Sequence, residues 1–99
     1  MAIAMVQDFP PQDGDTATTN YDAIHAAIME KVSEPTGLII HTAGFVGERF
    51  RIFEVWESRE QCENFIEKVV MPTVMEITRG SPAPPPTTTI YELHSVLHP

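Results

Sequence analysis

A ten-residue segment in the middle of the chain, RFRIFEVWES at residues 49–58, limits the possible folds more than any other. In an extended strand, successive side chains point to opposite faces. One face of this strand would be apolar apart from a single acid, and it carries Phe50, Ile52, Glu54 and Trp56. The other face carries Phe53 and Val55. A fold that contains this strand must therefore cover two apolar faces and accommodate the carboxylate of Glu54.

Hydrophobic periodicity predicts four strands, at residues 1–9, 38–45, 49–57 and 89–97. Apolar residues at three- and four-residue steps predict a helix over Asn20–Val32. A second helix follows the capping-box pattern of Ser58 and Gln61, and Pro72 either ends this helix or starts a short further one. The proline-rich residues 79–89 are predicted to form an extended connector. The order strand–helix–strand–strand–helix–strand is that of a ferredoxin-like α+β fold with a four-stranded antiparallel sheet.

Two helices can cover only one face of a four-stranded sheet, yet the first three predicted strands carry apolar residues on both faces. Leaving the second face in water would expose more contiguous apolar area than soluble monomers usually do. We therefore expect residues 1–99 to form a single ferredoxin-like domain that dimerises with a second copy of itself through the sheet face.

The composition excludes several classes of partner. The formal net charge is −8, which disfavours nucleic acid and anionic membranes, because both require a basic surface. The longest apolar runs are too short to cross a bilayer, and the N-terminus lacks the pattern of a signal peptide, so we expect a cytoplasmic protein. The single cysteine, Cys62, is predicted to be a core residue of a helix, and no Cys/His cluster indicates a metal site.

The turn between the second and third strands decides which residues face each other. If Gly47-Glu48 is a two-residue turn, His41 pairs with Glu54 and Ile39 with Trp56. A longer loop of different parity would instead place His41 beside Phe53 or Val55, because a one-residue slip exchanges the faces of a strand. The sequence leaves these alternatives open.

The run GLIIHTAGFVGERFRIFEVWESREQCENFIEKVVMPTV resembles the dimeric α+β barrel superfamily, in particular small proteins related to the antibiotic biosynthesis monooxygenases. The resembling features are a His on the second strand, a glycine before the hairpin, VWES leading into a helix, a Phe within that helix and an MP step after it. The resemblance implies a homodimeric barrel that binds small molecules. Some members oxidise aromatic polyketides with molecular oxygen and neither metal nor flavin, whereas others degrade haem, isomerise lactones or catalyse cyclisations.

The candidate catalytic residues are His41, as a general base, and Glu54, which would raise the proton affinity of His41 and fix its tautomer. The same two residues could equally be a satisfied polar pair in a dimer core. Trp56 is a candidate wall of the substrate pocket, and the other candidate substrate-binding residues are His25, Phe53 and Tyr91. No cofactor and no metal are expected. Haem degradation is disfavoured, because residues 58–77 contain no histidine to ligate iron as in the haem-degrading relatives.

Together with these residues, the resemblance implies a cofactor-independent, monooxygenase-like enzyme acting on an apolar, aromatic or polyketide-like compound. Two alternatives remain. One is a non-catalytic ligand-binding or structural dimer with the same pocket. The other is an isomerase or cyclase that uses the same acid–base pair without oxygen.

Overall fold

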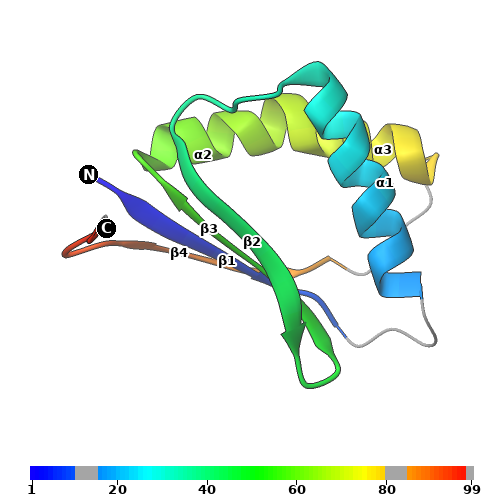
Figure 1. Ribbon diagram of the computed structural model, residues 1–99, viewed down its shortest axis with the longest axis horizontal. Helices are drawn as coiled ribbons and strands as arrows, with labels where there is room; N and C mark the ends of the chain where they lie inside the picture. Colours follow the sequence, from blue (N-terminus) through cyan, green and yellow to red (C-terminus); the bar gives the residue numbers. More distant parts are fainter. Residues whose placement is uncertain (11–15, 80–84, 98–99) are drawn as a thin grey trace.

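The computed structural model describes residues 1–10, 16–79 and 85–97, and its elements follow the predicted order (Figure 1). The strands are β1 (Ile3–Asp8), β2 (Leu38–Val46), β3 (Arg49–Trp56) and β4 (Thr87–Glu92). Helix α1 (Thr16–Lys31) joins β1 to β2. A second helical segment joins β3 to β4 and consists of α2 (Arg59–Phe65), a π-helical turn (Ile66–Val70) and α3 (Met71–Thr78).

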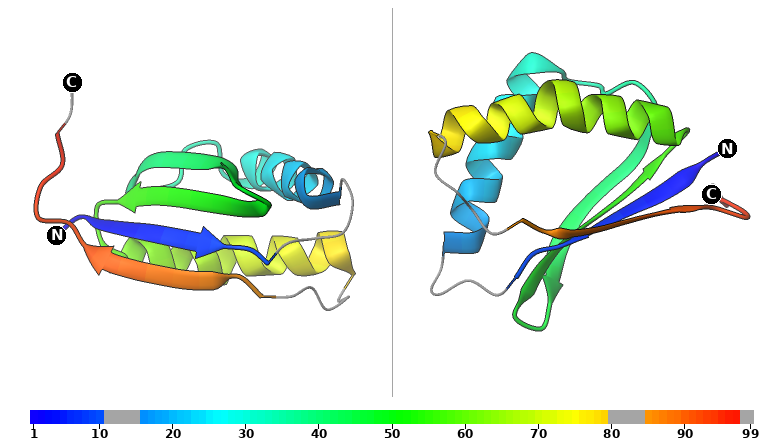
Figure 2. Two further views of the ribbon diagram at one scale, coloured as in Figure 1. Left: turned by 90° about the horizontal axis from the view of Figure 1, so that it is seen from below. Right: turned by 180° about the vertical axis from the view of Figure 1, so that it is seen from behind.

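The four strands form one antiparallel sheet in the order β2-β3-β1-β4. Both helical segments lie on the same side of this sheet, as the views in Figure 2 show. This arrangement confirms the predicted ferredoxin-like α+β fold.

The core lies between the sheet and the second helical segment. Its fully or almost fully buried members are Ile3, Met5, Trp56 and Cys62. Phe65 packs on Trp56 with its ring centroid 5.4 Å from that of the indole. The alternation predicted for β3 is therefore confirmed, because Trp56 faces the helices together with the other apolar residues predicted for its face of the strand.

The start of α2 has half of the predicted capping box. The Ser58 hydroxyl accepts a hydrogen bond from the backbone N–H of Gln61, at 3.2 Å. The Gln61 side chain does not return to the backbone N–H of Ser58; instead its carbonyl oxygen accepts a hydrogen bond from the Ser58 hydroxyl, at 3.0 Å. It also fills the space beside Gly37, where an added Cβ would clash with Gln61 Oε1 and where φ is +87°. Only glycine suits that position.

Pro72 begins a further helical stretch rather than ending the helix, which was one of the two predicted outcomes. It lies in the first turn of α3, where its missing N–H costs little, and the π-helical turn precedes it. Lys31, at the end of α1, donates to the hydroxyl of the buried Thr73 at 2.8 Å and pairs with Glu76 at 3.2 Å. These contacts fasten α1 to α3.

Two predicted boundaries are wrong. Helix α1 begins at Thr16, not at Asn20. Its first residues are mostly threonine and asparagine, so apolar periodicity alone cannot show that the helix includes them. The last strand is Thr87–Glu92, not 89–97, since its partner β1 begins at Ile3, which pairs with Glu92. His94 therefore follows the strand as an exposed residue. Part of the predicted connector, residues 79–89, lies outside the described residues, and its last three residues belong to β4.

The second face of the sheet carries no described helix (Figure 1). Phe53 and Val55 of β3 lie on this open face, together with Ile40 of β2 and Tyr91 of β4. Ile40 and Tyr91 are each about half exposed, at 48% and 47%. No described helix is long and apolar enough to span a membrane.

Candidate functional site

The β2–β3 hairpin has the two-residue turn Gly47-Glu48, with Gly47 in the left-handed region at φ +61°. In this register His41 pairs with Glu54. Of the two alternatives that the sequence left open, the structure thus has the one that places the imidazole and the carboxylate opposite each other. The predicted pairing of Ile39 with Trp56 is wrong, because a register shift between Leu38 and Ile40 pairs Leu38 with Trp56.

The carboxylate of Glu54 is buried, and both of its oxygens are hydrogen-bonded. Oε1 accepts from the indole N–H of Trp56 at 2.9 Å, and Oε2 contacts Nδ1 of His41. An ionised carboxylate only accepts hydrogen bonds, so Nδ1 of His41 must carry a proton to bond with it. Burial of a charged group without such partners would cost several kcal/mol, roughly. The two contacts therefore satisfy Glu54 and define the tautomer of His41.

Tyr21 extends this arrangement from the sheet to α1. Its hydroxyl lies 2.5 Å from Nε2 of His41, and the two ring planes are 4° apart. When His41 is neutral with its proton on Nδ1, Nε2 is an acceptor and the Tyr21 hydroxyl donates to it. Burial, followed by the negative charges of Glu54 and Asp22, raises the pKa of Tyr21 above its ordinary value of 10.0, so the phenol is protonated at neutral pH.

The hydrogen-bonded chain Trp56–Glu54–His41–Tyr21 runs from the core toward the solvent. Trp56 has no exposed surface, the Glu54 side chain is 12% exposed and the His41 side chain is 25% exposed. Tyr21 is half-buried. A carboxylate, an imidazole and a hydroxyl in sequence are the components with which proteins move a proton to or from a bound molecule.

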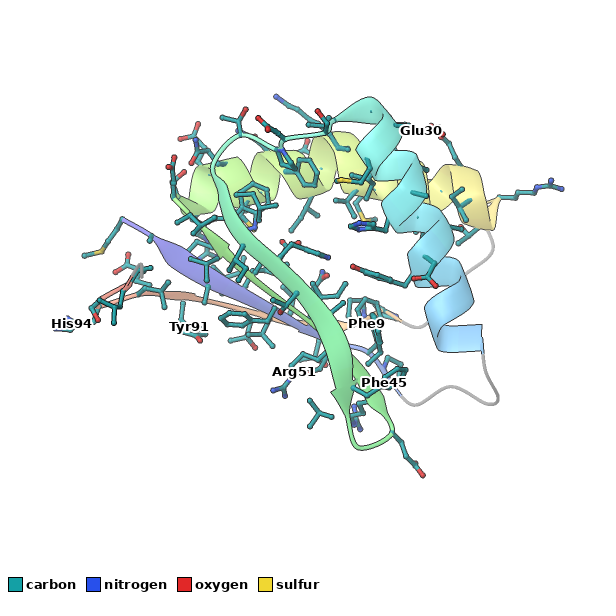
Figure 3. All side chains as sticks on the ribbon, viewed as in Figure 1. Phe9, Glu30, Phe45, Arg51, Tyr91 and His94 are labelled. Carbon is teal, nitrogen blue, oxygen red and sulfur yellow. The ribbon has the colours of Figure 1, made fainter. Side chains whose placement is uncertain are left out.

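Aromatic rings surround the outer end of the chain. His25, one turn along α1, stacks on both Tyr21 and His41, with centroid distances of 5.6 Å in each case. The ring of Phe50 lies 5.0 Å from that of Tyr21 and in turn contacts Phe9 and Phe45. Figure 3 labels Phe9 and Phe45, which lie toward the end of the hairpin, below α1. Phe45 is 58% exposed, so an aromatic surface borders the site.

The predicted site residues divide between the two faces of the sheet. His41, Glu54, Trp56 and His25 come together on the helix-covered face. Phe53 and Tyr91 lie on the open face, and Figure 3 shows Tyr91 on the side of the sheet away from the helices. Tyr91 also lines a hollow of about 450 Å³ at the end of β4, together with Met1, Ile3, Ser58, Arg59, Ile90 and Glu92. The chain from Trp56 to Tyr21 does not contribute to that hollow.

Neither metal binding nor nucleophilic catalysis by a cysteine has support in the described part of the chain. Residues 1–10, 16–79 and 85–97 contain no group of three or more His, Cys, Asp or Glu side chains that could hold a metal ion. Cys62 is completely buried, and burial raises the pKa of its thiol to about 11. It is a core residue rather than a nucleophile.

Sequence reasoning missed the part played by Tyr21. In the sequence, Tyr21 contributes only to the apolar periodicity of the first predicted helix and is not singled out. A phenol on the inward face of a helix needs a hydrogen-bond partner when it is buried, and that requirement is the signal that could have singled it out.

Comparison with known proteins identifies the fold. The chain matches no protein-family model and no curated protein. Among solved structures it is similar to Rv0793 from Mycobacterium tuberculosis, with a TM-score of 0.70 and 14% identity over 99% of this chain and 100% of that one. It is also similar to SnoaB, a cofactor-independent oxygenase from Streptomyces nogalater, with a TM-score of 0.63 and 12% identity over 97% and 96% of the two chains.

A third similar structure is a protein from Caulobacter crescentus, provisionally described as an antibiotic biosynthesis monooxygenase, with a TM-score of 0.70 and 10% identity over 95% of this chain and 91% of that one. At such identities the similarity establishes the fold. The chain has the fold of the antibiotic biosynthesis monooxygenase-like proteins, as the resemblance in its sequence implied.

The bonding of Glu54 leads to a stability prediction. Glu54→Ala leaves the N–H of the buried Trp56 without an acceptor, and we expect the free energy of unfolding in urea to fall by about 1–3 kcal/mol. Glu54→Gln keeps an oxygen for that N–H and should cost less. The exposed Glu57, three residues along, provides the control, because Glu57→Ala should change stability by no more than about 0.5 kcal/mol. Equal stabilities of the two alanine variants would contradict the bonding described for Glu54.

Proposed function

We propose that this protein is a homodimeric enzyme that deprotonates an aromatic hydroxyl and lets the resulting anion react with molecular oxygen, without a bound cofactor. The observation that carries the proposal is the chain from the buried Glu54 through His41 to Tyr21. A buried carboxylate that fixes an imidazole in one tautomer gives a base whose other nitrogen, Nε2, points in one direction, here toward the hydroxyl of Tyr21. The similarity in fold to a cofactor-independent oxygenase supports the same class of reaction.

The chemistry needs only a base and an electron-rich substrate. Removing the proton from a fused-ring phenol raises the electron density of the ring, which then reduces dioxygen. One oxygen atom is bonded to the ring carbon opposite the hydroxyl, and the other leaves as water with the two hydrogens that the substrate loses. His41 accepts the proton, and Glu54 stabilises the imidazolium that forms. Trp56 has no exposed surface, so in this proposal it holds Glu54 rather than forming a wall of the pocket.

The aromatic surroundings favour a flat, apolar substrate. His25 and Phe45 are only partly buried, and they border the site with ring faces and edges. Aromatic pairs in offset or edge-to-face arrangements contribute about 0.5–1.5 kcal/mol beyond the area they bury. A fused-ring phenol could therefore be held by stacking, while its hydroxyl meets the hydrogen-bonded chain.

The hydrogen-bonded chain also supports the alternative of an isomerase or a cyclase. The chain from Glu54 to Tyr21 moves protons, and proton transfer alone is sufficient to isomerise or cyclise an enol. A ligand-binding dimer would use the same aromatic surface and leave its ligand unchanged. These functions differ in their need for dioxygen and in the fate of the ligand.

An oxygen-uptake experiment separates the functions. We expect the protein to consume O2 with 1,5-dihydroxynaphthalene and to form the hydroxynaphthoquinone, with one atom from isotopically labelled O2 in the product. His41→Gln should lower the turnover by about 10²–10⁴-fold, because it removes the base. His94→Gln, which changes an exposed histidine beyond β4, should leave the turnover unchanged.

Turnover that survives His41→Gln would contradict the base assignment. Conversion of the probe to an isomer under anaerobic conditions would favour the isomerase, and recovery of bound, unchanged probe would favour the binding protein.

The open face generates a prediction about assembly. Covering Ile40, Phe53 and Tyr91 against a second copy would remove from water the apolar surface that the helices leave uncovered. We expect light scattering at micromolar concentration to give twice the chain mass of 11.1 kDa. Phe53→Glu should shift the population toward the monomer, because it places a charge in the proposed interface. Ser95→Glu, at an exposed position beyond β4, is the control. A wild-type chain that remains monomeric would contradict the homodimer.

A further inference from the structure

His41 does not present a free nitrogen to a substrate. Nδ1 contacts Glu54, and Nε2 already lies 2.5 Å from the hydroxyl of Tyr21. A substrate hydroxyl that bonded directly to Nε2 would have to displace Tyr21. The last polar atom of the hydrogen-bonded chain is therefore the oxygen of Tyr21, not a nitrogen of His41.

Tyr21 is held in this place from several sides. It projects from α1, whose far end is fastened to α3 through Lys31 and Thr73. Its ring stacks on His25 and contacts Phe50 on β3. Displacing the phenol would break these ring contacts as well as the hydrogen bond to His41. The packing thus favours a substrate that binds to Tyr21 over one that replaces it.

The geometry points to Tyr21 as the catalytic residue that exchanges a proton with the substrate, in a relay of carboxylate, imidazole and phenol that accepts an aromatic hydroxyl. This inference rests on the proposed function and specifies which atom meets the substrate. The substrate hydroxyl donates a hydrogen bond to the oxygen of Tyr21. As its O–H bond breaks, the proton passes to Tyr21, while the original proton of Tyr21 passes to Nε2 of His41.

The products of this step are a substrate phenolate, a neutral Tyr21 and an imidazolium paired with Glu54, so charge and protons balance. Tyr21 is neutral before and after the transfer. This matters because its surroundings disfavour a tyrosinate: burial and the nearby carboxylates of Glu54 and Asp22 raise the pKa of its phenol. After the transfer the Tyr21 hydroxyl donates to the substrate oxyanion and stabilises it.

The relay and direct use of His41 predict opposite effects of Tyr21→Phe. If His41 acted directly, the variant would free Nε2, and oxygen uptake with 1,5-dihydroxynaphthalene would stay the same or increase. In the relay the variant removes the group that contacts the substrate, and we expect kcat to fall by about 10²-fold or more, with a smaller change in KM. Tyr21→Phe should add no further loss to His41→Gln, because residues that act as a unit are not additive.

A second measurement covers the case in which Tyr21→Phe disturbs folding. Incorporating a fluorinated tyrosine at position 21 keeps the ring and the hydroxyl but makes the phenol more acidic. The relay predicts a shift in the pH–rate profile, whereas a purely structural Tyr21 predicts none.

The outcomes distinguish failure of the relay from failure of the proposed function. Loss of turnover in both Tyr21→Phe and His41→Gln, with no additional loss in the double variant, supports the relay. Turnover that depends on His41 but survives in Tyr21→Phe, or a pH–rate profile insensitive to fluorination, overturns the relay and leaves the proposed function standing. A wild-type protein that does not consume oxygen with the probe overturns both.

Discussion

The carboxylate of Glu54 lies in the face of the sheet that the helices cover, and the surrounding arrangement follows from how that charge is satisfied. Burying a carboxylate without hydrogen-bond partners would cost more free energy of folding than the packing of one residue can offset. The indole of Trp56 and the imidazole of His41 supply the two donors, and each is placed by a strand whose register is fixed. Binding one imidazole nitrogen in this way directs the other toward α1, where Tyr21 meets it. The acid–base character of the site is thus a consequence of one buried charge.

The two apolar faces of β3 have different roles in this fold. The face with Trp56 and Glu54 is covered by α1 and by the second helical segment of the same chain, and it contains both the core and the polar chain. The face with Phe53 and Val55 has no described helix against it. The proposed dimer would cover that second face without touching the hydrogen-bonded chain, so assembly and proton transfer would depend on opposite sides of one strand.

Much of the fold could be predicted from the sequence, because alternation in the strands, helical periodicity and the Gly47-Glu48 turn are local signals. The pairing of His41 with Glu54 needed only the length of that turn. The contact between Tyr21 and His41 could not be predicted in the same way, since it depends on how α1 docks across the sheet. Ile39 was misplaced because a bulge leaves no trace in period-two alternation, and β4 was extended too far because its end is set by its partner strand. Alternation within the strands likewise assigns Phe53 and Tyr91 to one face of their strands. It does not predict which face of the sheet borders the polar chain.

The tautomer of His41 is the most direct measure of whether Glu54 organises this site. A nitrogen–proton correlation spectrum of the imidazole rings reports the tautomer, and the signal of His41 is the one that is missing in His41→Gln. We expect this spectrum to place the proton of neutral His41 on Nδ1. In Glu54→Gln the amide can donate to Nδ1 while its oxygen accepts from Trp56, so the proton should move to Nε2. A neutral His41 that carries its proton on Nε2 in the wild-type protein, or a tautomer unchanged by Glu54→Gln, would contradict the central role given to Glu54.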